Sequence, residues 1–170
     1  MPMVLDALAT PGTSALGTRW AVVTDRVMGG VSDGSLAVEV LDGERCYRLR
    51  GDVRTDNNGG FLQLALPLSG GGGTVDASAF AGVTLRVRGN GERYGVHLRT
   101  ADSDAPWDSF RAEIEAGPAW SDVVLPWSAF VRAREREGVV DPRRLERIAL
   151  VALGRAFQAD VAMSYLALHR

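Results

Sequence analysis

Apolar and polar residues alternate with period two along much of this 170-residue chain, and this alternation most constrains its fold. Val83–Arg88, Val96–Arg99 and Phe110–Glu115 each place apolar side chains at every second position. Successive side chains of a strand point to opposite faces, so such segments have one face in a core and one polar face. The alternation therefore predicts a sheet protein in which each strand buries one face.

Further strands are predicted between turns that are rich in Gly, Pro, Asn and Asp. They are Ser35–Val40, Tyr47–Leu49, Gly60–Leu66, Asp122–Leu125, Arg147–Leu153 and Met163–Leu168. Asp141-Pro142 is typical of the start of a helical turn, with Asp as the N-cap and Pro at the first helical position. Many short strands predict an all-β sandwich of two antiparallel sheets with one or two short helical turns.

Asn90-Gly91 lies between two alternating segments, which is the strongest short-range signal for a hairpin with a type I′ turn. If Val83–Arg88 and Val96–Arg99 pair, and Phe110–Glu115 pairs next to them, their polar side chains share one sheet face. The residues of this predicted arginine face are Arg86, Arg88, His97, Arg99, Arg111 and Glu113. Trp107 lies in a nearby loop, where it could stack on a ligand.

Two interpretations of the arginine face remain open. It is either a solvated face on which Glu113 and Glu115 offset the arginines, or a face that binds carboxylate, phosphate or sugar hydroxyls through paired guanidinium hydrogen bonds. His97 is interpreted as a polar-face residue, because no second histidine lies near it in sequence.

Two glycine doublets lie among polar residues, Gly29-Gly30 and Gly59-Gly60. Glycine adopts positive φ, or admits the close approach of another group, at no steric cost. The residues of interest in these loops are Asp25, Met28, Gly29, Gly30, Ser32, Asn57, Asn58, Gly59, Gly60 and Phe61. Asp and Asn often satisfy only their own turns. We therefore expect the arginine face, rather than these loops, to be the main contact surface.

Composition narrows the class of protein. A net charge of −2 and 46% hydrophobic residues fit one globular domain, which we assign to residues 19–170 after an N-terminal extension over residues 1–18. The charge gives no strong signal for nucleic acid. Cys46 is the single cysteine, which excludes an internal disulfide. No apolar run reaches membrane-spanning length and no signal segment is evident, so a cytoplasmic location is expected.

The sequence contains no recognisable catalytic triad, metal motif or phosphate loop, so we expect a non-enzyme without a cofactor. Asp25, Asp33, Asp52 and Asp56 leave a structural calcium site open, although their spacing matches no known ligand loop. Gly89–Gly95 has the wrong spacing for the dinucleotide-binding fingerprint, and no helix follows it.

Several segments together carry a family resemblance. Val27–Ser32 and Asn57–Phe61, with Trp20 and Asp25 before them, resemble the signature of the complex I intermediate-associated protein 30 family. Later pieces are similar in order and spacing, namely Gly82–Gly91, Tyr94, Leu98–Thr100, Trp120, Leu125–Trp127, Phe130, Ile148–Leu150 and Phe157. The resemblance covers nearly the whole chain from Trp20, as in a stand-alone bacterial member of the family.

The resemblance implies a galactose-binding-domain-like jelly roll, an architecture shared with carbohydrate-binding modules. Mitochondrial members of the family assist the assembly of respiratory complex I, and plant relatives join a similar domain to a dinucleotide-binding fold. This chain departs from the family pattern at Leu62–Ala65, where many members have an arginine, so no role of that arginine is transferred.

These observations favour a non-catalytic binding or assembly module that contacts an unknown protein or a small polar ligand. A carbohydrate-binding module is the alternative implied by the shared architecture. A weaker alternative is an RNA-associated factor, which would need a basic face with aromatic residues.

Overall fold

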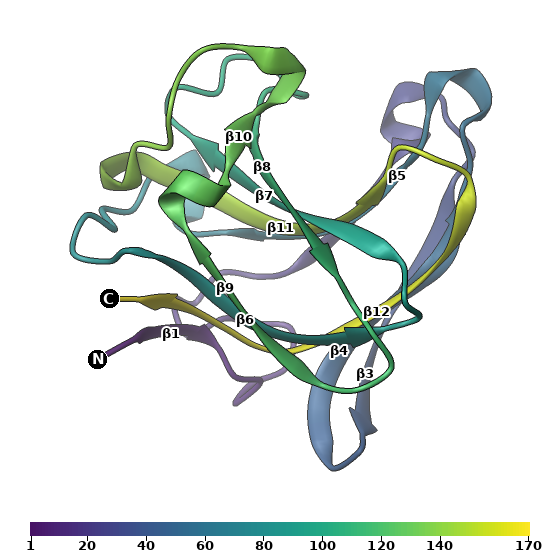
Figure 1. Cartoon of the computed structure of the whole chain (residues 1–170), viewed down its shortest axis with the longest axis horizontal. Helices are drawn as coiled ribbons and strands as arrows, with labels where there is room; N and C mark the ends of the chain where they lie inside the picture. The colour runs from purple at the N-terminus through teal and green to yellow at the C-terminus, as the bar shows by residue number, and fades with distance from the viewer.

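The computed structural model describes residues 1–170, with the exception of the side chain of Asn58. Figure 1 shows two antiparallel sheets that face each other, which confirms the predicted β-sandwich. The first, here called the β12 sheet, has the strand order β3-β4-β12-β6-β9, with β1 also paired to β12. The second, the β11 sheet, has the order β10-β8-β7-β11-β5-β2.

The predicted strands fall within strands of these sheets, except that the one predicted to begin at Gly60 begins at Phe61. The β12 sheet contains β1 (Met3–Asp6), β3 (Asp33–Leu41), β4 (Glu44–Val53), β6 (Gly82–Gly89), β9 (Ser121–Pro126) and β12 (Phe157–His169). The β11 sheet contains β2 (Ala21–Thr24), β5 (Phe61–Pro67), β7 (Arg93–Thr100), β8 (Phe110–Glu115), β10 (Val131–Arg132) and β11 (Leu145–Leu153). The sequence predicts no strand at β1, β2 or β10, because segments this short show too little alternation.

The core fills the space between the two sheets. Its largest fully buried side chains are Tyr47, Tyr94 and Phe110, packed among leucines that include Leu49, Leu64, Leu85 and Leu98. Each fully buried leucine stabilises the fold by roughly 2 kcal/mol relative to an exposed one. The alternate residues of the same strands point outward, and on the β11 sheet these outward residues form the site described below.

The hairpin predicted at Asn90-Gly91 is wrong. β6 lies between β12 and β9 in one sheet, and β7 lies between β11 and β8 in the other, so residues 90–92 connect the two sheets. Gly91 has a positive φ of 84°, but Asn90 has a negative φ, so the type I′ geometry is absent as well. Alternation specifies which residues of a strand are buried, but it does not specify the partner strand.

Short 3-10 turns connect many of the strands. Among the described residues there are six, more than the one or two expected, at Asp25–Met28, Asp56–Asn58, Gly70–Gly72, Trp127–Ala129, Ala133–Glu135 and Pro142–Arg144. The last begins as predicted, because the Asp141 carboxylate caps it by accepting from the Arg143 N–H. Among the described residues, no helix is both long enough and apolar enough to span a membrane.

The N-terminal residues pack on the sandwich through one buried carboxylate. β1 pairs with β12, and Asp6 at its end accepts hydrogen bonds from the Tyr47 hydroxyl at 2.7 Å and from the Trp20 indole N–H at 2.6 Å. Burial, together with the bond to Asp6, raises the pKa of Tyr47 to about 12. This network joins the first residues of the chain to β4 in the β12 sheet.

Candidate binding cleft

A cleft of about 840 Å³ lies on the outer face of the β11 sheet. Its floor is formed by the outward residues of the three adjacent strands β5, β11 and β7, namely Phe61, Gln63, His97, Arg99, Arg147, Ala149, Val151 and Leu153. Val27 and Met28 line one rim, and residues 103–107 with Arg134 line the opposite rim. A cleft of this size is typical of sites that bind small molecules or chain segments.

The first rim, here called the glycine rim, is organised by Asp25, which has no exposed surface. Its carboxylate accepts hydrogen bonds from the backbone N–H and the hydroxyl of Ser32, which follow the first glycine doublet. It also accepts from the N–H groups of Gly60 and Phe61, at the second doublet. The two doublets are 30 residues apart in sequence and meet around one side chain.

The glycines are required by the space around Asp25. A Cβ at Gly30 would lie 2.6 Å from the Asp25 Cγ, and a Cβ at Gly59 would lie 2.5 Å from its Oδ2, so neither position accepts a larger residue without a shift. Gly29 serves differently, because it ends the Asp25–Met28 turn in the left-handed region with a φ of 86°. Burial raises the pKa of Asp25, but the hydrogen bonds from Ser32, Gly60 and Phe61 outweigh this and lower it below its usual range.

The glycine rim carries two apolar side chains that are exposed at the edge of the cleft. Val27 and Met28 are 73% and 64% exposed at its edge, a high exposure for apolar side chains. The Asn57 side chain braces this turn by donating to the Gly29 carbonyl at 3.1 Å, whereas the side chain of Asn58 lies outside the described structure. From the sequence we expect the contact surface to lie away from these loops, but Val27 and Met28 of the first loop and Phe61 of the second line the cleft.

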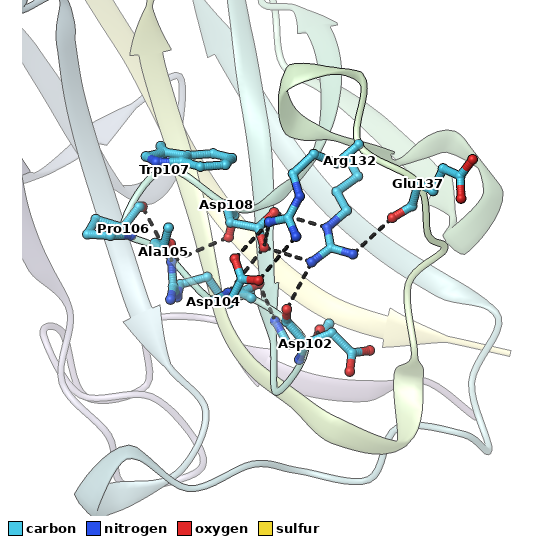
Figure 2. A network of polar contacts seen from close by, with 12 residues as sticks. Asp102, Asp104, Ala105, Pro106, Trp107, Asp108, Arg132 and Glu137 are labelled. Carbon is cyan, nitrogen blue, oxygen red and sulfur yellow. Dashed lines mark hydrogen bonds and ion pairs between the residues drawn. The ribbon is translucent and has the colours of Figure 1, made fainter.

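The opposite rim, here called the tryptophan rim, is organised by a second buried carboxylate, Asp108 (Figure 2). Arg132 donates to both carboxylate oxygens, at 3.0 and 2.8 Å, and Arg136 donates to Oδ2 at 2.9 Å. The Asp104 N–H completes the set at 3.1 Å. Because the hydrogen bonds and charge of Arg132 outweigh burial, the pKa of Asp108 is held well below its usual range.

Trp107 stands on this rim beneath arginine side chains. The Arg134 guanidinium lies 3.9 Å from the centre of the indole ring and that of Arg136 lies 5.6 Å from it. Arg134 and Glu135 both have positive φ, at 57° and 55°. Consecutive left-handed residues other than glycine are costly. Arg134 lines the cleft from this strained turn.

Two residues of the predicted arginine face hold the tryptophan rim in place. Arg99 donates to the Ala105 carbonyl at 2.7 Å, and Arg111 donates to the Trp107 carbonyl and to the Ser109 hydroxyl, both at 3.0 Å. Their guanidinium groups therefore serve the loop as well as the cleft. This positioning role is not among the roles expected from the sequence.

The predicted arginine face is divided between the two sheets, because β6 and β7 do not pair. Arg86 and Arg88 lie on the outer face of the β12 sheet, where Arg86 pairs with Glu44 at 2.8 Å and Arg88 pairs with Asp42. Glu113 lies outside the main cleft, in an exposed ion pair with Arg93 at 3.4 Å. Of the predicted set, His97, Arg99, Trp107 and Arg111 line the cleft together.

The floor of the cleft carries two arginines, Arg99 and Arg147, of which Arg147 forms no ion pair among the described residues. Arg147 of β11, which is not among the residues predicted from the sequence, lies on this face opposite Arg99 of β7. Burial and the neighbouring charge of Arg99 lower the pKa of Arg147. Burial, followed by the charge of Arg111, lowers the pKa of His97 to about 3, so its ring is neutral at physiological pH.

The aspartates considered for calcium do not form a suitable site. Asp25 already accepts hydrogen bonds from N–H and hydroxyl donors at both oxygens. Asp56 pairs with Arg54, and Asp33 and Asp52 are exposed residues opposite each other on β3 and β4. Within the part of the chain that the structure describes, no group of three or more His, Cys, Asp or Glu side chains could hold a metal ion.

A family model establishes the relationship that the sequence motifs suggest. Residues 12–160 match the model of complex I intermediate-associated protein 30, so the chain belongs to this family. No curated protein matches the sequence significantly.

Solved structures share the fold at low sequence identity. The family 11 carbohydrate-binding module of the cellulase Lic26A-Cel5E of Clostridium thermocellum has a TM-score of 0.77 and 12% identity, over 99% of this chain and 94% of that one. The family 11 module of C. thermocellum in complex with a β-1,3-1,4-mixed-linked tetrasaccharide has a TM-score of 0.75 and 13% identity, over 99% and 95%. The family 30 module of the C. thermocellum cellulase Cel9D-Cel44B has a TM-score of 0.57 and 17% identity, over 79% of this chain and 81% of that one. The fold is thus the jelly roll of these modules.

Proposed function

We propose that this protein is a non-catalytic binding module of the assembly-factor type, and that the cleft on the β11 sheet is its binding surface. Membership of the complex I intermediate-associated protein 30 family supports an assembly role. The observation that carries the choice of surface is the cleft itself, because it combines exposed apolar side chains with Arg111, Arg134 and Arg147, which form no ion pair among the described residues. Such a surface is stabilised when a partner covers it.

The choice of surface is tested by capture from a native lysate with matched variants. Met28→Asp places a charge on the exposed glycine rim, and Arg86→Ala serves as the control on the opposite sheet. We expect partners of the wild type to be retained by Arg86→Ala and lost by Met28→Asp, with both variants melting near the wild-type temperature. Partners lost by Arg86→Ala and retained by Met28→Asp would overturn the assignment of the cleft.

Carbohydrate binding is a second candidate. It is supported by the tetrasaccharide complex of a structural neighbour and by Trp107 on the rim of the cleft, where an aromatic ring could stack on a sugar. Arg134 lies over one face of that ring, which leaves less of the ring for a sugar. Gln63 is the one amide side chain among the residues that line the cleft.

A glycan panel that includes the β-1,3-1,4-mixed-linked tetrasaccharide tests this candidate by calorimetry. Binding at millimolar concentration or tighter, lost in Trp107→Ala, would support it. Absence of binding across the panel at that concentration would remove carbohydrate as the ligand and leave the binding-module proposal standing.

A further inference from the structure

The floor of the cleft has a cationic corner and an apolar end. Along β11 the outward residues run from Arg147 through Ala149 and Val151 to Leu153. At about 3.3 Å per residue, this row is roughly 20 Å long. Arg99 lies opposite Arg147 on β7, and Phe61 lies opposite Leu153 on β5. A ligand that follows the row therefore meets charge at one end and hydrocarbon at the other.

The cationic corner is only partly neutralised by the protein, because among the described residues one carboxylate, Glu146, lies near its two arginines. Two arginines directly opposite each other on paired strands repel. Arg99 has one carboxylate nearby, Glu146, whose Oε1 is 3.8 Å from the Arg99 Nε, too far for a hydrogen bond. The Arg99 Nε is buried without a hydrogen-bond partner among the described residues, and none of them forms an ion pair with Arg147.

The other charged groups that line the cleft do not change this balance. Asp104 is engaged by Arg136 at 2.7 Å, and Arg111 and Arg134 add positive charge. His97 is neutral. Arg147, by contrast, lines the cleft, and its guanidinium forms no hydrogen bond or ion pair among the described residues. An anion in the cleft that accepts from this guanidinium is favourable, and a carboxylate fits its geometry.

The apolar end favours a hydrocarbon chain over a peptide. β11 is hydrogen-bonded to β5 on one side and β7 on the other, so its backbone cannot pair with an added strand. Ala149, Val151 and Leu153 offer no hydrogen bonds to a peptide backbone, which would lose its bonds to water there without replacement. A hydrocarbon chain has no such requirement.

We infer that the cleft binds an amphipathic carboxylate, with its carboxylate at the Arg99–Arg147 corner and its hydrocarbon chain along Ala149, Val151 and Leu153 toward Phe61. This inference rests on the proposed function and names the chemical class of the ligand. Arg147 is the specificity residue, because Arg99 also holds the tryptophan rim. Met28 is at the edge of the same cleft, and its flexible side chain can adapt to the chain of the ligand.

The test is calorimetric titration with three compounds. Decanoate has both the carboxylate and the long chain, decanol has the chain without the carboxylate, and propionate has the carboxylate without the long chain. We expect decanoate to bind at least about tenfold more tightly than decanol, and propionate to bind at least about tenfold more weakly than decanoate. Arg147→Gln should weaken decanoate about tenfold and leave decanol unchanged, and Arg86→Gln, on the other sheet, should change neither.

Equal binding of decanoate and decanol, loss of decanoate binding in Arg86→Gln, or no binding of decanoate at millimolar concentration would overturn the inference. So would an apolar tetrapeptide with a free carboxylate that binds more tightly than decanoate, because the site would then fit a protein C-terminus. The lysate capture with Met28→Asp does not depend on decanoate. If decanoate does not bind but Met28→Asp still loses the captured partner, the ligand class is rejected and the cleft remains the proposed binding surface.

Discussion

The two rims of the cleft are each organised around one buried aspartate, but the two carboxylates are satisfied in different ways. Asp25 accepts from backbone N–H groups and a serine hydroxyl, which requires the chain to wrap closely around it. Asp108 accepts mainly from two long arginine side chains, Arg132 at the end of β10 and Arg136 just after the Ala133–Glu135 turn. The first arrangement needs glycine at fixed positions. The second needs only opposite charges within reach.

The largest effect is expected at the glycine rim. Asp25→Ala leaves several buried donors without an acceptor, and we expect a loss of about 4 kcal/mol in the free energy of unfolding. Urea denaturation measures this loss, and Asp33→Ala, at an exposed position, is the control with an expected change below about 0.5 kcal/mol. A loss below about 1 kcal/mol for Asp25→Ala would show that the rim does not depend on this carboxylate.

The corresponding change on the tryptophan rim is Asp108→Ala. Arg132 is only 12% exposed, so its charge would remain largely desolvated without a partner, and we expect a loss of about 3 kcal/mol. The same denaturation experiment, repeated at high salt, distinguishes the rims. Because the lost interaction is ionic and Arg136 is partly exposed, the loss should shrink with salt for Asp108→Ala but not for Asp25→Ala. Equal salt responses would contradict the comparison.

Within the first glycine doublet, the two positions should respond differently. Gly30→Ala forces a Cβ against the Asp25 carboxylate, and we expect it to cost about 2 kcal/mol. Gly29→Ala meets open space but must adopt a φ of 86°, for which about 1 kcal/mol is expected. Thermal unfolding of the two variants gives the order, and a larger loss at Gly29 would reverse our explanation of the doublet.

His97, on the floor between the rims, should make stability depend on pH. Its pKa of about 3 in the folded chain is below the ordinary value near 6.5, so the unfolded chain takes up the proton first as the pH falls. Stability is therefore full above pH 6.5 and is lost progressively toward pH 3, by about 2 kcal/mol between pH 6.5 and 4.5. The lowered pKa values of Asp25 and Asp108 act below this interval. In His97→Gln the melting temperature should vary less between pH 6.5 and 4.5 than in the wild type. An equal dependence of melting temperature on pH in the two proteins would argue against a desolvated His97 ring.

The smallest effect is expected for Arg134→Gly on the tryptophan rim. The substitution removes the contact with Trp107, worth about 0.5–1 kcal/mol, and also relieves a positive φ of similar cost. We expect the free energy of unfolding to change by less than about 0.5 kcal/mol. Chemical denaturation measures it, and a loss above about 2 kcal/mol would assign Arg134 a structural role like that of Arg132.

The difference between the rims also explains what the sequence could predict. Alternation places Leu98 and Phe110 in the core and His97 and Arg111 on the opposite face, and the glycine doublets mark unusual backbone directly. The partner of each strand is not encoded locally, so Arg86 and Arg99 are predicted to share a face although they lie on different sheets. Asp108 and Arg132 are 24 residues apart with no motif between them, and nothing in the sequence distinguishes this pair from other opposite charges.

Asp25 has one further consequence, for the entropy of binding. Its carboxylate connects the turn at Val27–Met28 to the start of β5 through hydrogen bonds from the N–H groups of Gly60 and Phe61, which are 35 and 36 residues away in sequence. The turn therefore cannot loosen without breaking these hydrogen bonds as well. The exposed side chains of Val27 and Met28 therefore stand on a base that is ordered before any ligand arrives. Binding there does not need to order the backbone, so more of the contact energy remains as affinity.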